Sequence, residues 1–379
     1  METKKFNYII CGGGASGLLL ADKLVSDPYF VNKKILLIEK DSKSINDRTW
    51  CFWEKGAGEL DKIVSRKWDF AYFKSDGFVK KFETKPYTYK QIRGIDFYNN
   101  FLEIKSKDNN LSYLNAQVKN INKKQNIVTT DKGTYFGEYI FTSILDINII
   151  KNQKQYPFLK QHFIGQLIET QNEIFSPDAV TIMDFDLPQK KSTRFMYILP
   201  FSRTKALVEY TLFSPTELKT SEYKRSIKAY LNNLDSGSYK VLETEKGSIP
   251  MTAYKFRSGN TKKLLHIGTA GGWTKASTGY TFLNTINKTN SLVSFLKKEK
   301  HLNKFEKNTR FWFYDLLFLD VLNKHNEMGS SIFKIMFERN KPEIIFKFLD
   351  NKTSLFEEIK LMYTFKKSWF IEALIKRLF

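Results

Sequence analysis

The feature that most constrains the fold is a glycine-rich turn close to the start of the chain. An apolar run ends at Cys11, then Gly12, Gly14 and Gly17 follow in G-x-G-x-x-G spacing, and Leu18 begins a helical pattern. In this spacing the first glycine permits a tight turn, the second lets the backbone approach a pyrophosphate, and the third lets the helix pack on the strand. The N-terminus of that helix offers N–H groups and a positive dipole end to phosphate. The pattern predicts a βαβ dinucleotide-binding unit.

A second apolar run, over residues 34–39, is predicted to be the next strand of this unit, and Glu39 stands at its end. An acidic residue in this place can accept a hydroxyl group of the cofactor's ribose. A tight turn that binds no nucleotide is the alternative for the whole pattern. The residues that we expect to contact the nucleotide are Gly12, Gly14, Ala15, Ser16, Gly17, Glu39 and Lys40.

Two further stretches indicate contacts with the same cofactor. Residues 46–54 are dense in both aromatic and charged side chains, which favours a cofactor-lining loop over simple packing in the core. Far downstream, the apolar residues 264–267 lead into three glycines, and a helix is expected from about Tyr280. Two strand–glycine–helix units that grip one cofactor are typical of FAD-binding folds of the glutathione-reductase type. The residues that we expect to contribute are Arg48, Gly268, Gly271, Gly272, Thr278 and Gly279.

The chain between the two glycine units is rich in strand patterns. Residues 160–215 alternate between apolar and polar side chains, which predicts a half-buried antiparallel sheet, and a helix is expected at about residues 221–231. Residues 89–105 carry a helical pattern, and residues 111–142 are strand-like, with a hairpin turn at residues 131–133. We therefore predict an α/β fold, in which a glutathione-reductase-type FAD-binding Rossmann domain carries an inserted antiparallel sheet lobe for the substrate and a C-terminal helical segment.

A length of 379 residues exceeds one ordinary domain and suggests two or three lobes. The expected segments are a FAD-binding βαβ unit (1–60), a sheet-lobe segment (61–84), a return to the FAD-binding domain (85–150), the antiparallel substrate lobe (151–254), the closure of the FAD-binding domain (255–300) and a helical segment that can face a membrane (301–379).

The composition limits the partners and the compartment. The chain carries a formal charge of +21 and is 15% aromatic, which fits an anionic membrane surface. Two cysteines, Cys11 and Cys51, make no disulfide framework and favour a reducing cytosol, and the four scattered histidines indicate no metal site. We expect no signal peptide, because the first strand begins within a few residues of Met1.

From Phe305 onward the chain is predicted to be helical, with basic residues placed between Phe, Ile and Leu, as in residues 333–339 and 369–379. Such amphipathic helices either pack on the body of the protein or lie on anionic lipid, and both interpretations stay open. No apolar run approaches the roughly 20 residues of a spanning helix. We therefore expect a cytoplasmic protein that associates peripherally with the inner face of the cell membrane.

Together these motifs resemble the bacterial flavin-dependent lycopene beta-cyclases. The matching motifs follow the order of that family over about residues 6–283, and from about Asn284 on the resemblance is one of general character. The motifs are Gly12–Gly17, Asn46–Trp53, Met183–Phe185, Phe195–Pro200, Leu207–Ser214, Gly247–Met251 and Ile267–Gly279.

The resemblance implies a redox-neutral isomerisation, in which the linear ends of lycopene close into beta-ionone rings to give gamma-carotene and then beta-carotene. It implies that FAD is bound and active in its reduced form, with NADPH or NADH as the reductant. The catalytic acid of the family carries over to Glu209, within Leu207–Thr211. The oligomeric state is left open.

A physical argument for Glu209 stands beside the resemblance. An alkene is a very poor base, so its protonation needs an acid that stays protonated in a dry pocket. Glu209 is predicted in mid-strand among Leu, Val, Tyr and Phe, where desolvation raises the pKa of a carboxyl group. The alternative is a glutamate on the polar, solvent-facing side of the strand. Asp184 is the second candidate acid, and a reduced flavin could stabilise the cation or donate the proton itself.

Other classes of function compete with this interpretation. A flavin redox enzyme, such as a monooxygenase, a halogenase or an isoprenoid reductase, would share the fold, so only consumption of oxygen or reductant distinguishes it. A basic nucleic-acid-binding protein would explain the charge and would bind DNA in a salt-dependent way, but no recognised nucleic-acid module is present. A structural membrane protein without catalysis would leave the two glycine units unexplained.

Overall fold

The glycine-rich turn lies at the carboxyl edge of a mainly parallel sheet. The computed structural model describes residues 4–105 and 110–378, and the sheet has the order β8-β2-β1-β11-β10-β9, with β17 added beside β11. Its parallel strands all end at the edge where the turn lies, which is where α/β sheets bind their ligands. The strands are β1 Lys4–Cys11, β2 Ile35–Glu39, β8 Leu111–Asn115, β9 Val118–Asn122, β10 Ile127–Thr130, β11 Gly133–Thr142 and β17 Leu264–His266.

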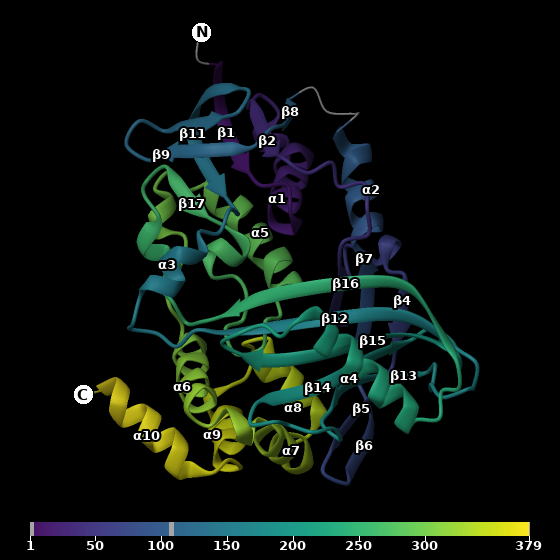
Figure 1. Cartoon of the computed structure of the whole chain (residues 1–379). Helices are drawn as coiled ribbons and strands as arrows, with labels where there is room; N and C mark the ends of the chain where they lie inside the picture. Colours follow the sequence, from purple (N-terminus) through teal and green to yellow (C-terminus); the bar gives the residue numbers. More distant parts are fainter. Residues whose placement is uncertain (1–3, 106–109, 379) are drawn as a thin grey trace.

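The two faces of this sheet are covered differently. Side chains such as Ile10 and Leu37 point to one face, where α1 (Ala15–Ser26) and α5 (Phe282–Leu296) pack in one apolar cluster. Ile9 and Val128 belong to the cluster on the other face, under the hairpin of β9 and β10. The predicted α/β class with a nucleotide-type parallel sheet is confirmed (Figure 1).

A second, mostly antiparallel sheet crosses the middle of the molecule in the order β16-β12-β15-β14-β13-β5-β6 (Figure 1). The helix α4 (Thr220–Asn233), predicted at residues 221–231, covers one face and packs on Val208 and Leu212. Because side chains alternate along a strand, Leu207, Glu209 and Phe213 point to the opposite face. The strands are β5 Phe70–Ser75, β6 Phe78–Glu83, β12 Leu159–Thr170, β13 Ala179–Asp184, β14 Thr193–Pro200, β15 Lys205–Ser214 and β16 Tyr239–Met251.

A small third sheet of three strands includes residues that were predicted to be helical. The helix expected over residues 89–105 is wrong in its first part, because β7 (Tyr87–Arg93) is the central strand between β3 (Thr49–Lys55) and β4 (Arg66–Trp68). Hydrogen bonding to strands on both sides overrides the local helical spacing. The helix α2 begins only at Gly94 and runs to Lys105.

The C-terminal helices lie below the second sheet, on the face that carries Glu209 (Figure 1). The last helix, α10 (Lys367–Leu378), is held on α6 (Arg310–Lys324) because Arg377 and Lys376 both pair with Asp320, at 2.5 and 2.9 Å. Within the described residues, no helix combines the length and the apolar character needed to cross a bilayer. The helices are α3 Ile147–Asn152, α6 Arg310–Lys324, α7 Gly329–Arg339, α8 Pro342–Leu349, α9 Leu355–Tyr363 and α10 Lys367–Leu378, with short 3₁₀ turns at Pro28–Phe30, Asp61–Ile63, Phe256–Gly259, Gly268–Gly271, Leu302–Lys304 and Asn326–Met328.

Candidate active site

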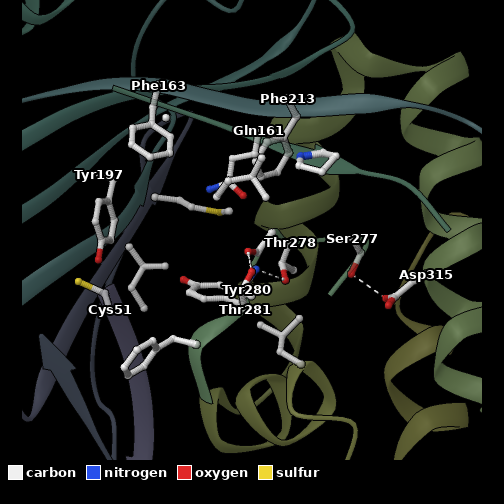
Figure 2. A pocket seen from close by; sticks show the side chains of 18 of the residues that line it. Cys51, Gln161, Phe163, Tyr197, Phe213, Ser277, Thr278, Tyr280, Thr281 and Asp315 are labelled. Carbon is white, nitrogen blue, oxygen red and sulfur yellow. Dashed lines mark hydrogen bonds between the residues drawn. The ribbon is translucent and has the colours of Figure 1, made fainter. Parts of the chain in front are cut away.

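A cavity of about 950 Å³ extends from the N-terminus of α1, past the second sheet, to the C-terminal helices. Figure 2 shows side chains of the sheet, among them Phe163, Tyr197 and Phe213, facing Thr278 and Tyr280 of the loop that precedes α5. Most of the cavity wall is apolar or aromatic.

At the nucleotide end, the glycines occupy places that other residues would not fit. Gly12 has φ +102°, and a Cβ atom on Gly17 would overlap the carbonyl oxygen of Gly12. Apart from the neighbours of Gly14 along the chain, no atom of the described residues would lie within 4 Å of a Cβ atom placed on it, so the space beside it is open. The helix α1 begins directly after Gly14 without a side-chain cap, and Gly14, Ala15 and Ser16 line the cavity. Free N–H groups at a helix N-terminus that faces a cavity suit an anionic ligand.

The two glycine units meet at the cavity. Gly268 has φ +59°, and a Cβ atom there would come within 2.5 Å of the Ser16 hydroxyl oxygen. Gly268, Thr278 and Gly279 line the cavity. Gly271 packs so closely that a Cβ atom would overlap the carbonyl oxygen of His266. The close approach of Gly268 to Ser16 brings together two predicted cofactor residues that are about 250 positions apart in the chain.

Other predicted cofactor residues have different surroundings. The carboxylate of Glu39 accepts hydrogen bonds from the backbone N–H of Gly13, at 2.5 Å, and of Asp41, at 2.9 Å, so it fixes the glycine turn. Lys40 is exposed. Arg48 lines the cavity and pairs with Asp47 at 2.6 Å. Gly12, Gly17, Glu39, Lys40, Gly271 and Gly272 are not part of the cavity wall.

Glu209 lies in the middle of β15 with its carboxyl group in the cavity wall, and only 7% of the residue is exposed. The Thr211 hydroxyl donates a hydrogen bond to Oε1 of Glu209 at 2.5 Å. Burial, reinforced by the nearby carboxylate of Glu245 and opposed by the Thr211 hydrogen bond, raises the pKa of Glu209 to about 8. A glutamic acid in this environment is mostly protonated at pH 7.

Aromatic and weakly polar groups line the same cavity as Glu209. The Tyr89 and Tyr197 hydroxyl groups are hydrogen bonded to each other at 2.9 Å, and Trp53 meets Tyr280 edge-to-face at 4.5 Å. Burial raises the pKa of the Cys51 thiol, which lies below Tyr197 in Figure 2. Electron-rich ring faces around a buried acid can stabilise a cation formed beside them.

The structure places Asp184 away from this cavity. Asp184 is 2% exposed, accepts a hydrogen bond from the Tyr230 hydroxyl at 2.6 Å and pairs with Lys74 at 3.2 Å. Its neighbour Met183 lines the cavity, whereas Asp184 does not and instead lies opposite Lys74 on the adjoining strand β5. Glu209 and Asp184 are therefore not brought together.

Among the cavity residues that the sequence interpretation did not name, Glu245 is a second buried carboxylic acid. Glu245 on β16 lines the cavity, and the Thr49 hydroxyl donates to its Oε2 atom at 2.8 Å. Burial is the main cause that raises the pKa of Glu245 to about 7. Its neighbours Glu243 and Lys246 make the stretch look like a solvated strand, and the only sequence signal was its place two residues before Gly247.

The solved structures that this chain resembles show its fold. It superposes over 95% of its length on 96% of a geranylgeranyl bacteriochlorophyll reductase-like protein from Thermoplasma acidophilum, with a TM-score of 0.61 at 11% identity. The flavin-dependent brominase Bmp2 gives 0.58 at 11% identity, with 99% of each chain covered. The p-nitrophenol 4-monooxygenase PnpA from Pseudomonas putida gives 0.56 at 14% identity, with 96% and 98% covered. The fold is that of the FAD-binding oxidoreductases and halogenases.

The sequence then narrows the class to one family. The model of the lycopene cyclase protein family matches residues 7–373, which is nearly the whole chain. The chain therefore belongs to the lycopene cyclase family. No curated protein matches it in sequence.

Proposed function

We propose that the protein is a lycopene beta-cyclase that converts the linear ends of lycopene into beta-ionone rings without net oxidation or reduction. The observation that carries this proposal is the protonated, buried carboxyl group of Glu209 in the wall of a large apolar cavity that begins at a nucleotide-type glycine turn. Membership of the lycopene cyclase family supports the choice of substrate.

The chemistry follows from the properties of the carboxyl group. Glu209 donates its proton to the terminal double bond, which leaves a tertiary cation at the neighbouring carbon. The next double bond of the chain attacks that cation, a ring closes, and a proton is then lost. Tyr197, Tyr280 and Phe213 line the cavity around the acid and exclude water that would otherwise trap the cation.

The residues present fit an FAD molecule. Gly14, Ala15 and Ser16 would hold its pyrophosphate at the uncapped start of α1, and Gly268 and Thr278 would contact it from the second glycine unit. Gln161 supports a polar ligand here, because it lines the cavity and its buried Oε1 atom has no hydrogen-bond partner within the described part of the chain. Reduced FAD, generated with NADPH or NADH, would supply an electron-rich ring system whose field favours a nearby cation.

The substrate of this reaction partitions into lipid, so we also propose that the protein docks on the anionic inner face of the cell membrane through α9 and α10. Their exposed apolar side chains recur at helical spacing, and they are Leu355, Phe356, Ile359, Tyr363, Ile371, Ile375 and Leu378. The exposed lysines Lys360, Lys366 and Lys376 lie among them. Ile371 is 52% exposed and also lines the cavity, which supports passage of an apolar substrate from this face.

The test is expression in a bacterium that accumulates lycopene. Formation of beta-carotene, with a mass equal to that of lycopene, is the expected result. The second candidate function, a flavin redox enzyme, is favoured by the solved structures of similar fold. Consumption of oxygen or NAD(P)H in proportion to product would establish that candidate and would contradict the cyclase.

A further inference from the structure

A second carboxyl group, that of Glu245, lies on the same face of the sheet as Glu209, with the strand β12 between them. In the register of the strands, Gly165 on β12 pairs with Glu209 on β15 and with Glu245 on β16. Residues opposite each other in antiparallel strands point to the same face, and both glutamates line the cavity. A Cβ atom on Gly165 would come within 3.2 Å of Cγ of Glu245 and of Cδ1 of Leu207, and within 3.4 Å of Oε1 of Glu245. The glycine therefore lets the Glu245 side chain lie over β12, the strand between the two glutamates.

The two carboxyl groups have different surroundings. Glu209 has the apolar side chains of the cavity around it and one hydrogen bond, from Thr211. Glu245 is half-buried on the edge strand and accepts a hydrogen bond from Thr49. The charged groups that act on Glu245 are Glu243, Asp47 and Arg48, and Lys246 also lines the cavity. Of the pair, Glu245 is therefore the group in contact with the polar end of the site.

Two carboxyl groups in one poorly solvated site do not ionise independently. Burial raises the pKa of both glutamates, and the negative charge of Glu245 raises the pKa of Glu209 further. Pairs of this kind commonly divide the roles of acid and base between them. The more exposed member gives up its proton first, which leaves the proton on Glu209.

We propose, on the basis of the proposed function, that Glu209 and Glu245 share one proton, and that Glu245 is the base that receives the proton lost after ring closure. The O–H bond of Glu209 breaks as its proton adds to the terminal alkene carbon, and the ring carbon–carbon bond forms. A C–H bond next to the cationic carbon then breaks, its electron pair forms the ring double bond, and its proton passes to Glu245. Exchange with water at Glu245 and reprotonation of Glu209 restore the pair, so no net proton or electron is consumed.

The first test does not need catalysis. The infrared C=O band of Glu209, identified as the band missing from Glu209→Gln, is titrated in the purified FAD-loaded protein and in Glu245→Gln. Removal of the charge at Glu245 should move the ionisation of Glu209 to lower pH by about one unit or more. Glu169→Gln makes the same charge change at an exposed place on β12 and should leave the band where it is. An unchanged titration in Glu245→Gln would overturn the shared proton, whether or not the protein cyclises lycopene.

The second test measures the base. With lycopene in vesicles, Glu245→Gln should form rings at least about 100-fold more slowly, and more of its product should be isomers that have lost the proton from another carbon next to the cation. Glu245→Asp keeps a carboxyl group and should recover part of the rate, which separates loss of the base from loss of folding. If Glu245→Gln binds FAD and cyclises within twofold of the unchanged protein, Glu245 is not the base. If the unchanged protein makes no rings, the proposed function fails instead.

Discussion

Single side chains determine the chemistry of this site, and the proposed role of Glu209 as the acid can be tested directly. Because Glu209 is protonated up to about pH 8, cyclisation should be sustained at pH 7 and fall as the pH rises through its pKa and the carboxyl group loses its proton. Glu209→Gln, which matches the shape of the side chain but cannot protonate an alkene, should lower the rate by at least about 100-fold and retain FAD. Product formation against pH and the flavin absorbance of the purified variant measure both effects. Full activity in Glu209→Gln would remove this residue from the mechanism.

Asp184 provides the contrasting residue-scale prediction. Its carboxylate is buried with Tyr230 and Lys74, on the face of β13 that turns away from the cavity. Asp184→Asn should therefore lower the free energy of unfolding by about 1–3 kcal/mol and leave the rate per folded molecule within a few fold of normal. Thermal unfolding, together with rates corrected for FAD content, checks this. A folded variant without activity would place Asp184 in the chemistry after all.

At the scale of elements, two glycines of the glycine turn have different roles: Gly17 is needed for packing, and Gly14 faces the proposed ligand. Gly17→Val should prevent stable folding, because the new side chain would overlap the Gly12 carbonyl. Gly14→Val should fold, since open space surrounds that position, and should lose FAD because valine would occupy the site of the pyrophosphate. Thermal unfolding and the flavin content of both variants make the comparison. A fully loaded Gly14→Val protein would contradict the assignment of the phosphate site.

The helices α9 and α10 are predicted to bind the membrane surface. The double variant Phe356→Glu and Ile375→Glu should lower binding to anionic vesicles by about 10-fold or more, because it places negative charge on the face that is proposed to contact lipid. The double variant Val79→Glu and Val31→Glu adds the same charge and is the matched control, since Val79 on β6 and Val31 are similarly exposed, at 57% and 62%. Co-flotation with vesicles of anionic and neutral lipid gives the measurement. Equal losses in the double variant and the control would point to net charge rather than to this face.

At the scale of the whole molecule, the strongly patterned parts of the sequence predicted the fold well. The two glycine units and the alternating strands 160–215 have local signals that the tertiary structure uses directly. The helix expected from residue 89 was wrong because β7 obtains its hydrogen bonds from two distant strands. Glu245 was missed because its role depends on a register with Gly165, which lies 80 residues away and has no signature along the chain. The chain alone also left open which C-terminal helices face solvent, since α7 buries Phe333 and Phe337 while α9 exposes Phe356.

The contact between Gly268 and Ser16 has a consequence for biosynthesis. The first βαβ unit leaves the ribosome long before β17 exists, so the site around Ser16 is incomplete until the chain of 379 residues has been made as far as Gly268. A nascent protein of 200 residues would carry the whole first fingerprint and yet lack the opposite wall. FAD would then bind late in the maturation of the protein. Flavin absorbance would therefore indicate that the fold is complete.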